Sequence, residues 1–124
     1  MAFYKALEQG DFDYCSTLFA EDAAIWHNYD QHEQSSETVL SELALVPARL
    51  RFEVVGRDVL ADACIQRHIV HLCGVGGATA QFPAIQRIQL RDGLIQRIDE
   101  YLDPAAVEAA GRDVTDRRPS AQAF

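Results

Sequence analysis

The sequence predicts an α+β fold in which helices pack against one face of a long, bent, mostly antiparallel sheet. The first part of the chain carries apolar residues at helical spacing, and the second part carries long β-like segments. Gly56 and Pro83 interrupt two of these segments, as residues do where a strand bends, bulges or lies at an edge. Long strands with bends curl the sheet into a cone, and the helices cover its concave face. At 124 residues the chain forms one domain.

Two helices are expected at the start of the chain. Apolar residues at helical spacing predict a first helix from Phe3 to Leu7, and Gly10 ends it in the left-handed conformation. Asp11 is a suitable N-cap for the second helix. The apolar stripe of that second helix consists of Phe12, Cys15, Leu18 and Phe19.

A short strand at 23–28 precedes the third helix. Ser35 or Ser36 caps this helix, and Pro47 ends it. Its apolar side consists of Val39, Leu40, Leu43 and Val46.

Four long strands and a terminal helix complete the domain. Asp103 and Pro104 form an N-cap and N1 pair that opens the helix, and Gly111 ends it. The domain therefore covers residues 1–111, and residues 112–124 are expected to be a polar, loosely ordered tail. The strands are expected at 50–60, 63–72, 78–90 and 94–102.

Charge and composition argue against several kinds of partner. The net charge of −8 does not suit nucleic acid or an anionic membrane surface, which need clustered Lys and Arg. Early charges at the N-terminus argue against a signal peptide, and no run of 18 apolar residues predicts a membrane span.

The number of cysteines is odd, and none of them has CxxC spacing, so the sequence predicts neither a disulfide framework nor a zinc site. The three are Cys15, Cys64 and Cys73. A reducing cytoplasm is the expected location.

The turn at 91–93 determines which residues of the last two strands face inward. A three-residue loop pairs Gln86 with Ile98 and gives a largely apolar inward face. A two-residue loop places Ile88 opposite Arg97 and mixes charge into both faces. The three-residue loop is favoured, because a slip of one residue moves the whole apolar set into solvent.

Glu100 is the first candidate for catalysis. It lies between Ile98 and Leu102 on the predicted inward face, where a desolvated carboxylate is suited to proton transfer. The alternative is that Glu100 reaches water near the strand end or pairs with an arginine.

The strand at 63–72 has two faces, and the pattern does not choose between them. One face carries Gln66 and His68, and His68 would then be a second titrating group near Glu100. A histidine satisfied by hydrogen bonds in a partly polar sheet surface is the competing interpretation. The other face carries Arg67, as a counter-ion or oxyanion donor.

The short strand before the third helix offers binding residues. Trp26 and Asn28 are two apart, so on an extended strand they share one face. A metal site needs three converging ligands. The acidic and histidine residues of this region lie in one short polar segment, so a solvated loop is favoured and no metal site is predicted. Those residues are His27, Asp30, His32 and Glu33.

These elements together resemble the nuclear transport factor 2-like superfamily. The resemblance rests on FYKALEQGDFDYCSTLFAEDAAIWHN, on the capped helix around SSETVLSEL and on LRDGLIQRIDEYLD. Within the superfamily, the chain is similar to the SnoaL-like and limonene epoxide hydrolase-like branches over residues 3–110. The resemblance implies a cone-shaped barrel of the cystatin-like roll type with a deep apolar pocket. It also implies a homodimer formed through the outer face of the sheet.

The resemblance also implies roles for particular residues. Trp26 and Asn28 occupy the places of a Tyr-x-Asn pair that epoxide hydrolases of this group carry, so Asn28 would hold a water or a substrate oxygen. Glu100 takes the place of their last-strand aspartate. His68 and Val70 stand where an Arg-x-Asp pair is expected, so a second carboxylate is missing. The tyrosine donor of ketosteroid isomerases aligns near Phe3, and their base aligns near His27.

Two hypotheses about function follow. The first is a cofactor-independent cyclase, isomerase or hydrolase acting on a small apolar molecule, in which Glu100 transfers a proton and His68 assists. Trp26, Asn28, Gln66 and Gln86 would shape its pocket. The second is a non-catalytic module that binds an apolar ligand or assembles through its sheet. The fold hosts both, so it does not decide between them.

Overall fold

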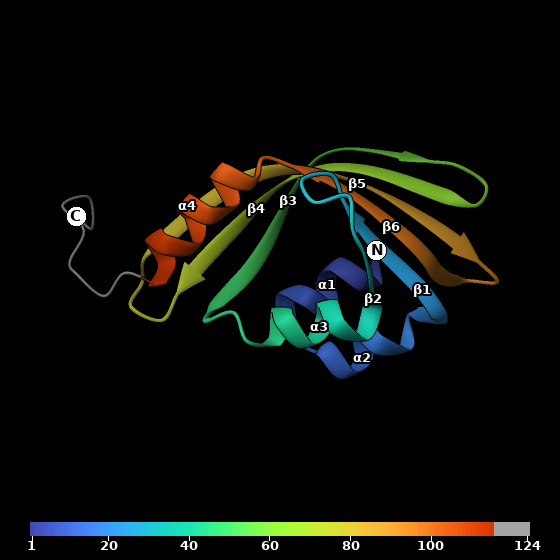
Figure 1. Cartoon of the computed structure of the whole chain (residues 1–124), viewed down its shortest axis with the longest axis horizontal. Helices are drawn as coiled ribbons and strands as arrows, with labels where there is room; N and C mark the ends of the chain where they lie inside the picture. Colours follow the sequence, from blue (N-terminus) through green and yellow to red (C-terminus); the bar gives the residue numbers. More distant parts are fainter. Residues whose placement is uncertain (116–124) are drawn as a thin grey trace.

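The structure is a computed structural model that describes residues 1–115, and within them a curved six-stranded sheet is combined with four helices (Figure 1). The helices are α1 (Ala2–Gln9), α2 (Phe12–Thr17), α3 (Ser36–Ala44) and α4 (Pro104–Thr115). The strands are β1 (Phe19–His27), β2 (Glu33–Ser35), β3 (Ala48–Val59), β4 (Ala63–Gly74), β5 (Thr79–Arg91) and β6 (Leu94–Leu102).

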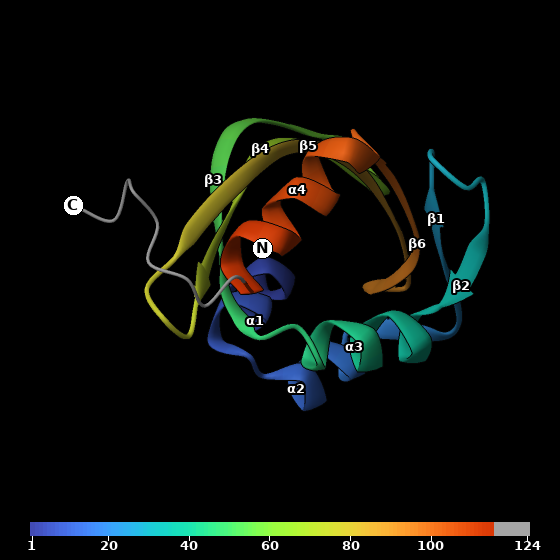
Figure 2. The ribbon, with the colours of Figure 1, turned by 60° about the vertical axis from the view of Figure 1, so that its left-hand side comes forward.

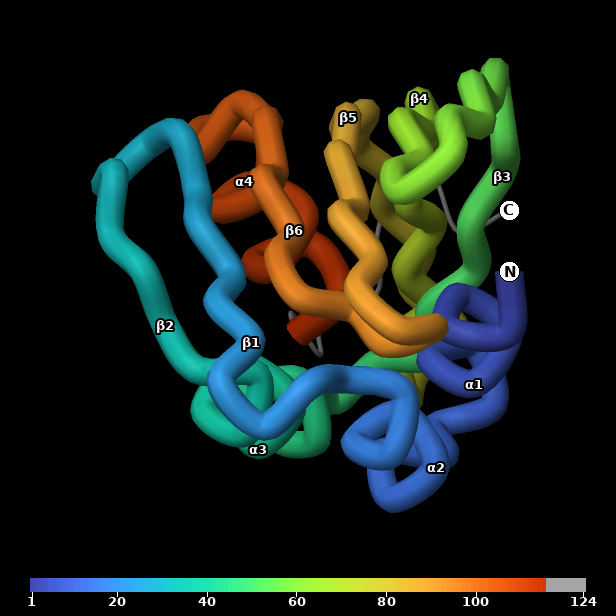
Figure 3. Tube along the Cα trace, turned by 90° about the vertical axis from the view of Figure 1, so that its right-hand side faces the viewer, coloured from blue at the N-terminus to red at the C-terminus, as the bar shows by residue number. Residues whose placement is uncertain are grey.

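The sheet is curved and mostly antiparallel, as the sequence predicts. Its strand order is β2-β1-β6-β5-β4-β3, and only the β1–β6 pairing is parallel. The sheet arches over helices α1, α2 and α3, which cover one end of its concave side (Figure 2). Helix α4 lies inside the same curve, with β3 to β5 on one side and β6 on the other (Figure 2), and it is seen behind β6 in Figure 3.

Three predicted helix caps, Gly10, Asp11 and Ser35, are confirmed. Gly10 ends α1 with φ 69°, in the left-handed region that glycine adopts readily. The Asp11 carboxylate accepts a hydrogen bond of 3.1 Å from the backbone N–H of Tyr14, and Ser35 Oγ accepts one of 3.1 Å from that of Thr38. These bonds satisfy backbone donors that a helix start leaves free.

Several predicted boundaries differ from the structure, and one strand was missed. Helix α2 ends at Thr17, and Phe19 already begins β1, so the first strand is longer than expected. The short strand β2 was not predicted, because its three residues carry no apolar alternation. Helix α4 continues through Gly111 to Thr115, since tertiary packing of its last turns outweighs the low helix propensity of one glycine. The remainder of the predicted tail, 116–124, lies outside the described residues.

Gly56 and Pro83 mark irregular positions, as expected. The β3–β4 register shifts between Val54 and Gly56, which is a bulge in β3. Pro83 pairs with Ile69 of β4, while on its other side the pairing with β6 begins only at Ala84. Pro83 therefore lies where β5 becomes an edge on that side, so its missing N–H costs no ladder hydrogen bond.

The predicted three-residue loop at 91–93 is wrong. The turn contains two residues, Asp92 (φ 54°) and Gly93 (φ 79°), and Arg91 pairs with Leu94. One extra residue, Gln96, then forms a bulge in β6, so that Ile88 pairs with Ile98. The bulge restores the apolar face that a two-residue loop alone would have broken.

The same bulge changes which residue of the hairpin is buried. With the bulge, Ile95 is buried at 3% exposure, whereas Leu94 beside the turn is 38% exposed.

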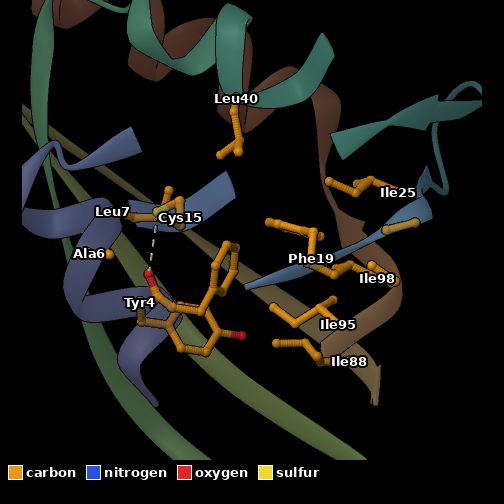
Figure 4. Close-up of a cluster of buried hydrophobic side chains, with 13 residues drawn as sticks. Tyr4, Ala6, Leu7, Cys15, Phe19, Ile25, Leu40, Ile88, Ile95 and Ile98 are labelled. Carbon is orange, nitrogen blue, oxygen red and sulfur yellow. Dashed lines mark hydrogen bonds between the residues drawn. The ribbon is translucent and has the colours of Figure 1, made fainter. Parts of the chain in front are cut away.

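Two apolar clusters fill the concave side. The first joins α1, α2 and α3 to β1, β5 and β6, and its side chains point toward a common centre (Figure 4). Its members include Phe3, Leu7, Cys15, Phe19, Ile25, Leu40, Ile88, Ile95 and Ile98. The second joins α4 to β4 through Val70, Leu72, Ala110 and Val114. Leu50 and Phe52 of β3 contact both clusters.

Candidate functional site

A row of polar side chains crosses the concave face between the two apolar clusters. The row runs through five adjacent strands, and each member is the register partner of the next. On one side of it lies an apolar row that contains Ile88 and Ile98, and on the other side His68 precedes the second cluster. The members of this polar row are Arg57 (β3), Gln66 (β4), Gln86 (β5), Glu100 (β6) and His27 (β1).

Gln86 connects helix α1 to Glu100 in the middle of the row. Its Oε1 accepts a hydrogen bond of 2.7 Å from the Tyr4 hydroxyl, and its Nε2 donates one of 2.5 Å to Glu100 Oε2. The other carboxylate oxygen, Oε1, lies 3.1 Å from His27 Nε2. Both oxygens of Glu100 are thus held by neighbouring side chains, as a charge in a mostly apolar interior requires.

His27 and Glu100 form a shielded pair. Their side chains are only 12% and 16% exposed. The hydrogen bond to Glu100 raises the pKa of His27, although burial opposes this shift. The second ring nitrogen, Nδ1, is buried and has no hydrogen-bond partner among the described residues. The pair therefore offers one unused nitrogen for proton transfer.

Tyr4 acts as a neutral hydrogen-bond donor in this arrangement. Burial, followed by the nearby Cys64 and Glu100, raises the pKa of its hydroxyl well above the usual range. The phenol therefore keeps its proton at all ordinary pH values and donates it to Gln86.

A second hydrogen-bonded chain links β3 to β4 at the other end of the polar row. Arg57 Nε donates a hydrogen bond of 2.7 Å to Gln66 Oε1, and Gln66 Nε2 lies 3.0 Å from His68 Nδ1. The His68 ring meets the rings of Tyr4 and Phe52 edge-on, at centroid distances of 5.4 and 5.2 Å. Burial lowers the pKa of His68, and the charge of Glu100 opposes this shift.

The structure brings four predicted site residues together. Glu100, Gln86 and Gln66 are members of the polar row, and His68 follows Gln66 on the same inward face. Of the two faces left open for β4, the one with Gln66 and His68 is inside, whereas Arg67 is exposed on the outside.

Trp26 and Asn28 do not join this group. The indole of Trp26 packs edge-on against Tyr101 at 5.4 Å, on the face of the sheet opposite His27. Asn28 lies just past the end of β1. Its backbone N–H donates to the Glu100 carbonyl, and its Oδ1 accepts 3.0 Å from the N–H of Leu102. Asn28 thus prolongs the parallel pairing.

Three residues of the site were missed in the sequence. His27 was assigned to a solvated loop, because the parallel pairing of β1 with β6 was not predicted. Tyr4 was overlooked although it lies three residues before Leu7, a spacing that places both on one side of a helix. Arg57 faces inward only because of the bulge at Gly56, and that glycine was the available signal.

The largest of the described cavities lies elsewhere. It has a volume of about 690 Å³, includes Arg49, Arg51 and His71, and contains no member of the polar row. We place the candidate site at the polar row because His27 and Glu100 are largely shielded from solvent and are linked to their neighbours by hydrogen bonds, which is typical of reactive centres.

Neither a metal centre nor a membrane helix is found in residues 1–115. No three side chains of His, Cys, Asp or Glu are grouped closely enough to hold a metal ion there. No helix in this part of the chain combines the length and apolar character that a bilayer crossing needs.

Solved structures share the fold at low sequence identity. One of them is a protein from Xanthomonas campestris pv. campestris that has been assigned as a polyketide cyclase without a demonstrated activity. It superposes with a TM-score of 0.74 at 22% identity, over 89% of this chain and 91% of that one. An LEH-like epoxide hydrolase from M. tuberculosis gives 0.72 at 17% identity, over 88% and 79%. A hypothetical protein with a ketosteroid isomerase-like fold from Catenulispora acidiphila, complexed with trimethylamine, gives 0.74 at 16% identity, over 95% of both chains.

The family assignment rests on the sequence. No curated protein matches the chain. The family model for the SnoaL-like domain matches residues 1–98, which is most of the chain and includes four of the five members of the polar row. The fold, with its curved open sheet and its helices on the concave side, is the one found in the similar structures. The chain therefore belongs to the SnoaL-like domain family of the nuclear transport factor 2-like superfamily.

Proposed function

We propose that the protein is a cofactor-independent enzyme that transfers a proton on a small apolar substrate, with Glu100 and His27 as its acid/base pair. The observation that carries this proposal is the contact between His27 Nε2 and Glu100 Oε1 in a polar row that is flanked by apolar side chains. A carboxylate beside an imidazole orients the ring and stabilises the imidazolium that forms when the ring takes a proton.

Each group of the polar row has a role in this proposal. Glu100 holds Nε2 of His27, so the unpartnered Nδ1 takes the proton from the substrate and returns it later. Gln86, anchored by Tyr4, fixes the second carboxylate oxygen. Proton transfer thus involves the pair rather than Glu100 alone, and His68 assists from β4, two strands away from Glu100.

The substrate class follows from the surroundings of the row. Aliphatic and aromatic side chains flank it on both sides, which suits a small apolar molecule. The names of the similar structures, polyketide cyclase and epoxide hydrolase, support small-molecule chemistry of this kind. The row contains one carboxylate rather than two, which favours cyclase or isomerase chemistry over the two-carboxylate hydrolysis implied by the resemblance.

The proposal is tested by hydrogen exchange at carbon. The protein is incubated in D₂O with cyclic ketones such as cyclohexanone, and deuterium uptake beside the carbonyl is followed by NMR. Replacing Glu100 with Gln keeps the shape and the Gln86 contact but removes the charge, and the exchange rate is expected to fall about 10²- to 10⁴-fold. His27→Gln should cause a similar loss.

The control is Glu53→Gln, which alters an exposed carboxylate that contacts His71 and leaves the polar row intact. If Glu100→Gln retains the wild-type exchange rate, the acid/base role is wrong. If no ketone exchanges but the ketones still bind, the binding-module hypothesis replaces it.

We also infer that two copies associate through the convex face of the sheet. Ile85 and Tyr101 are register partners on this face, and they are 41% and 50% exposed. Exposed apolar residues beside charged ones suit a two-fold, self-complementary contact.

We propose a reducing cytoplasm as the location of the protein. The three cysteines are unpaired, which supports this proposal.

A further inference from the structure

A buried polar group that the acid/base pair does not use lies beside the polar row. His68 is 1% exposed, and its Nε2 has no hydrogen-bond partner among the described residues. Leaving a buried polar atom unpaired costs free energy, so such an atom points to a partner that the folded chain does not supply.

The contacts of Gln66 determine the protonation of this ring. Arg57 is only a donor, so the Gln66 atom that faces it at 2.7 Å must be the amide oxygen. The amide NH₂ then faces His68 Nδ1 at 3.0 Å, and Nδ1 must accept. In a neutral imidazole the proton therefore lies on Nε2, which is the unpartnered nitrogen. Burial lowers the pKa of His68 and so favours this neutral form.

Arg57 reaches Gln66 because of a local irregularity in β3. Before the bulge, Phe52 and Val54 pair with inward residues of β4, so strict alternation would turn Arg57 outward. The register shift between Val54 and Gly56 makes Arg57 the partner of Gln66 instead. Bulges re-aim side chains in this way beside functional sites.

We propose that Arg57, acting through Gln66, holds His68 as a neutral Nε2–H donor for the carbonyl or enolate oxygen of an apolar ligand. Glu100 lies two strands away, or about 10 Å along the sheet, a distance that a small cyclic molecule spans. This inference rests on the proposed function: removal of a proton by His27 and Glu100 places negative charge on the substrate oxygen, and a fixed donor stabilises that charge. Arg57 and Gln66 are positioning residues in this scheme.

The tautomer of His68 is read directly by two-bond ¹H–¹⁵N NMR correlations of the imidazole rings, with His68→Gln to assign the signals. We expect the Nε2–H form alone in the wild-type protein. This readout needs no turnover, so it separates the present proposal from the acid/base proposal. A His68 found as the Nδ1–H tautomer or as imidazolium at neutral pH overturns it.

Arg57 variants test the positioning role. In Arg57→Met the Gln66 amide is free to turn over, so a mixture of both tautomers should appear, and Arg57→Lys should restore most of the Nε2–H form. Arg51→Met is the matched control, since Arg51 is an exposed arginine of the same strand and its register partner is His71. If Arg57→Met leaves the tautomer unchanged, Arg57 has no positioning role.

A pair of probes tests the ligand chemistry. Acetophenone and ethylbenzene have similar shapes, but only acetophenone carries a carbonyl oxygen. Acetophenone should move the Nε2–H resonance of His68 downfield and should bind about tenfold more weakly to Arg57→Met, the amount one hydrogen bond typically contributes. Ethylbenzene should not move that resonance. Equal shifts with both probes, or none with acetophenone, refute the donor role.

Discussion

The contact between His27 and Glu100 stabilises the charges of both side chains and raises the pKa of His27. Each lies among apolar side chains, where an isolated charge is costly. Paired at 3.1 Å, the imidazolium and the carboxylate stabilise each other, so the pKa of His27 rises. The pair is buried enough for this interaction to be screened little by solvent, unlike a surface ion pair.

The raised pKa of His27 predicts a pH-dependent stability. Because the folded-state pKa lies above the unfolded value of about 6.5, the pair contributes fully below that pH. Its contribution is lost as the pH rises through the folded-state pKa. The free energy of unfolding of the wild-type protein should therefore exceed that of His27→Gln at pH 5.5, and the difference should shrink by pH 9.

Urea unfolding of both proteins at a series of pH values measures this difference. His68, whose pKa is shifted in the opposite direction, is present in both proteins and cancels in the comparison. A difference that stays constant or grows with pH would contradict the pairing.

Helix α4 is the element whose placement depends most on close packing. Its buried residues Ala110 and Val114 contact the second apolar cluster on β4. Gly74, at the end of β4, lies directly under the last turn of the helix. A Cβ added at Gly74 would lie 2.4 Å from the backbone carbonyl oxygen of Val114.

Gly74→Ala should therefore displace the end of α4. Backbone atoms cannot move aside as a flexible side chain can, and overpacking of this kind typically costs about 1–3 kcal/mol. Gly76→Ala is the matched control, because no atom lies within 4 Å of an added Cβ there. Thermal unfolding of both variants measures the effect, and equal stabilities would show that α4 is not held at this contact.

At the scale of the whole molecule, the curved sheet has two faces with different tasks. The concave face carries the polar row and both apolar clusters. The convex face carries exposed apolar residues between charged ones, and it is the face proposed above for the contact between two copies.

Ile85→Asp should weaken that contact. A charge in the middle of an apolar interface is left desolvated and unpaired, so the variant should sediment as a monomer at concentrations where the wild-type protein is a dimer. Val75→Asp, at an exposed turn residue between β4 and β5, is the control and should not change the molecular mass. A wild-type protein that remains monomeric at all concentrations would contradict the assignment.

Short local patterns in the sequence predicted several helix caps and one strand of this molecule. The predicted strand 94–102 matches the structure, and Gly10, Asp11 and Ser35 act as the predicted caps. Such features depend on side chains within a few residues of one another, so a single sequence reveals them. The resemblance added the family and the curved fold.

The tertiary structure alone decided the composition of the polar row. His27 meets Glu100 because β1 pairs in parallel with β6, from which it is separated by five other elements of the chain. The bulges at Gly56 and Gln96 set which side chains of β3 and β6 face inward, and neither bulge's position follows from alternation. Trp26 faces outward for a similar reason, since its neighbour His27 is the residue that points to Glu100. A side chain's face in a sheet is reversed by a shift of one residue, and only the long-range pairing of the strands fixes that register.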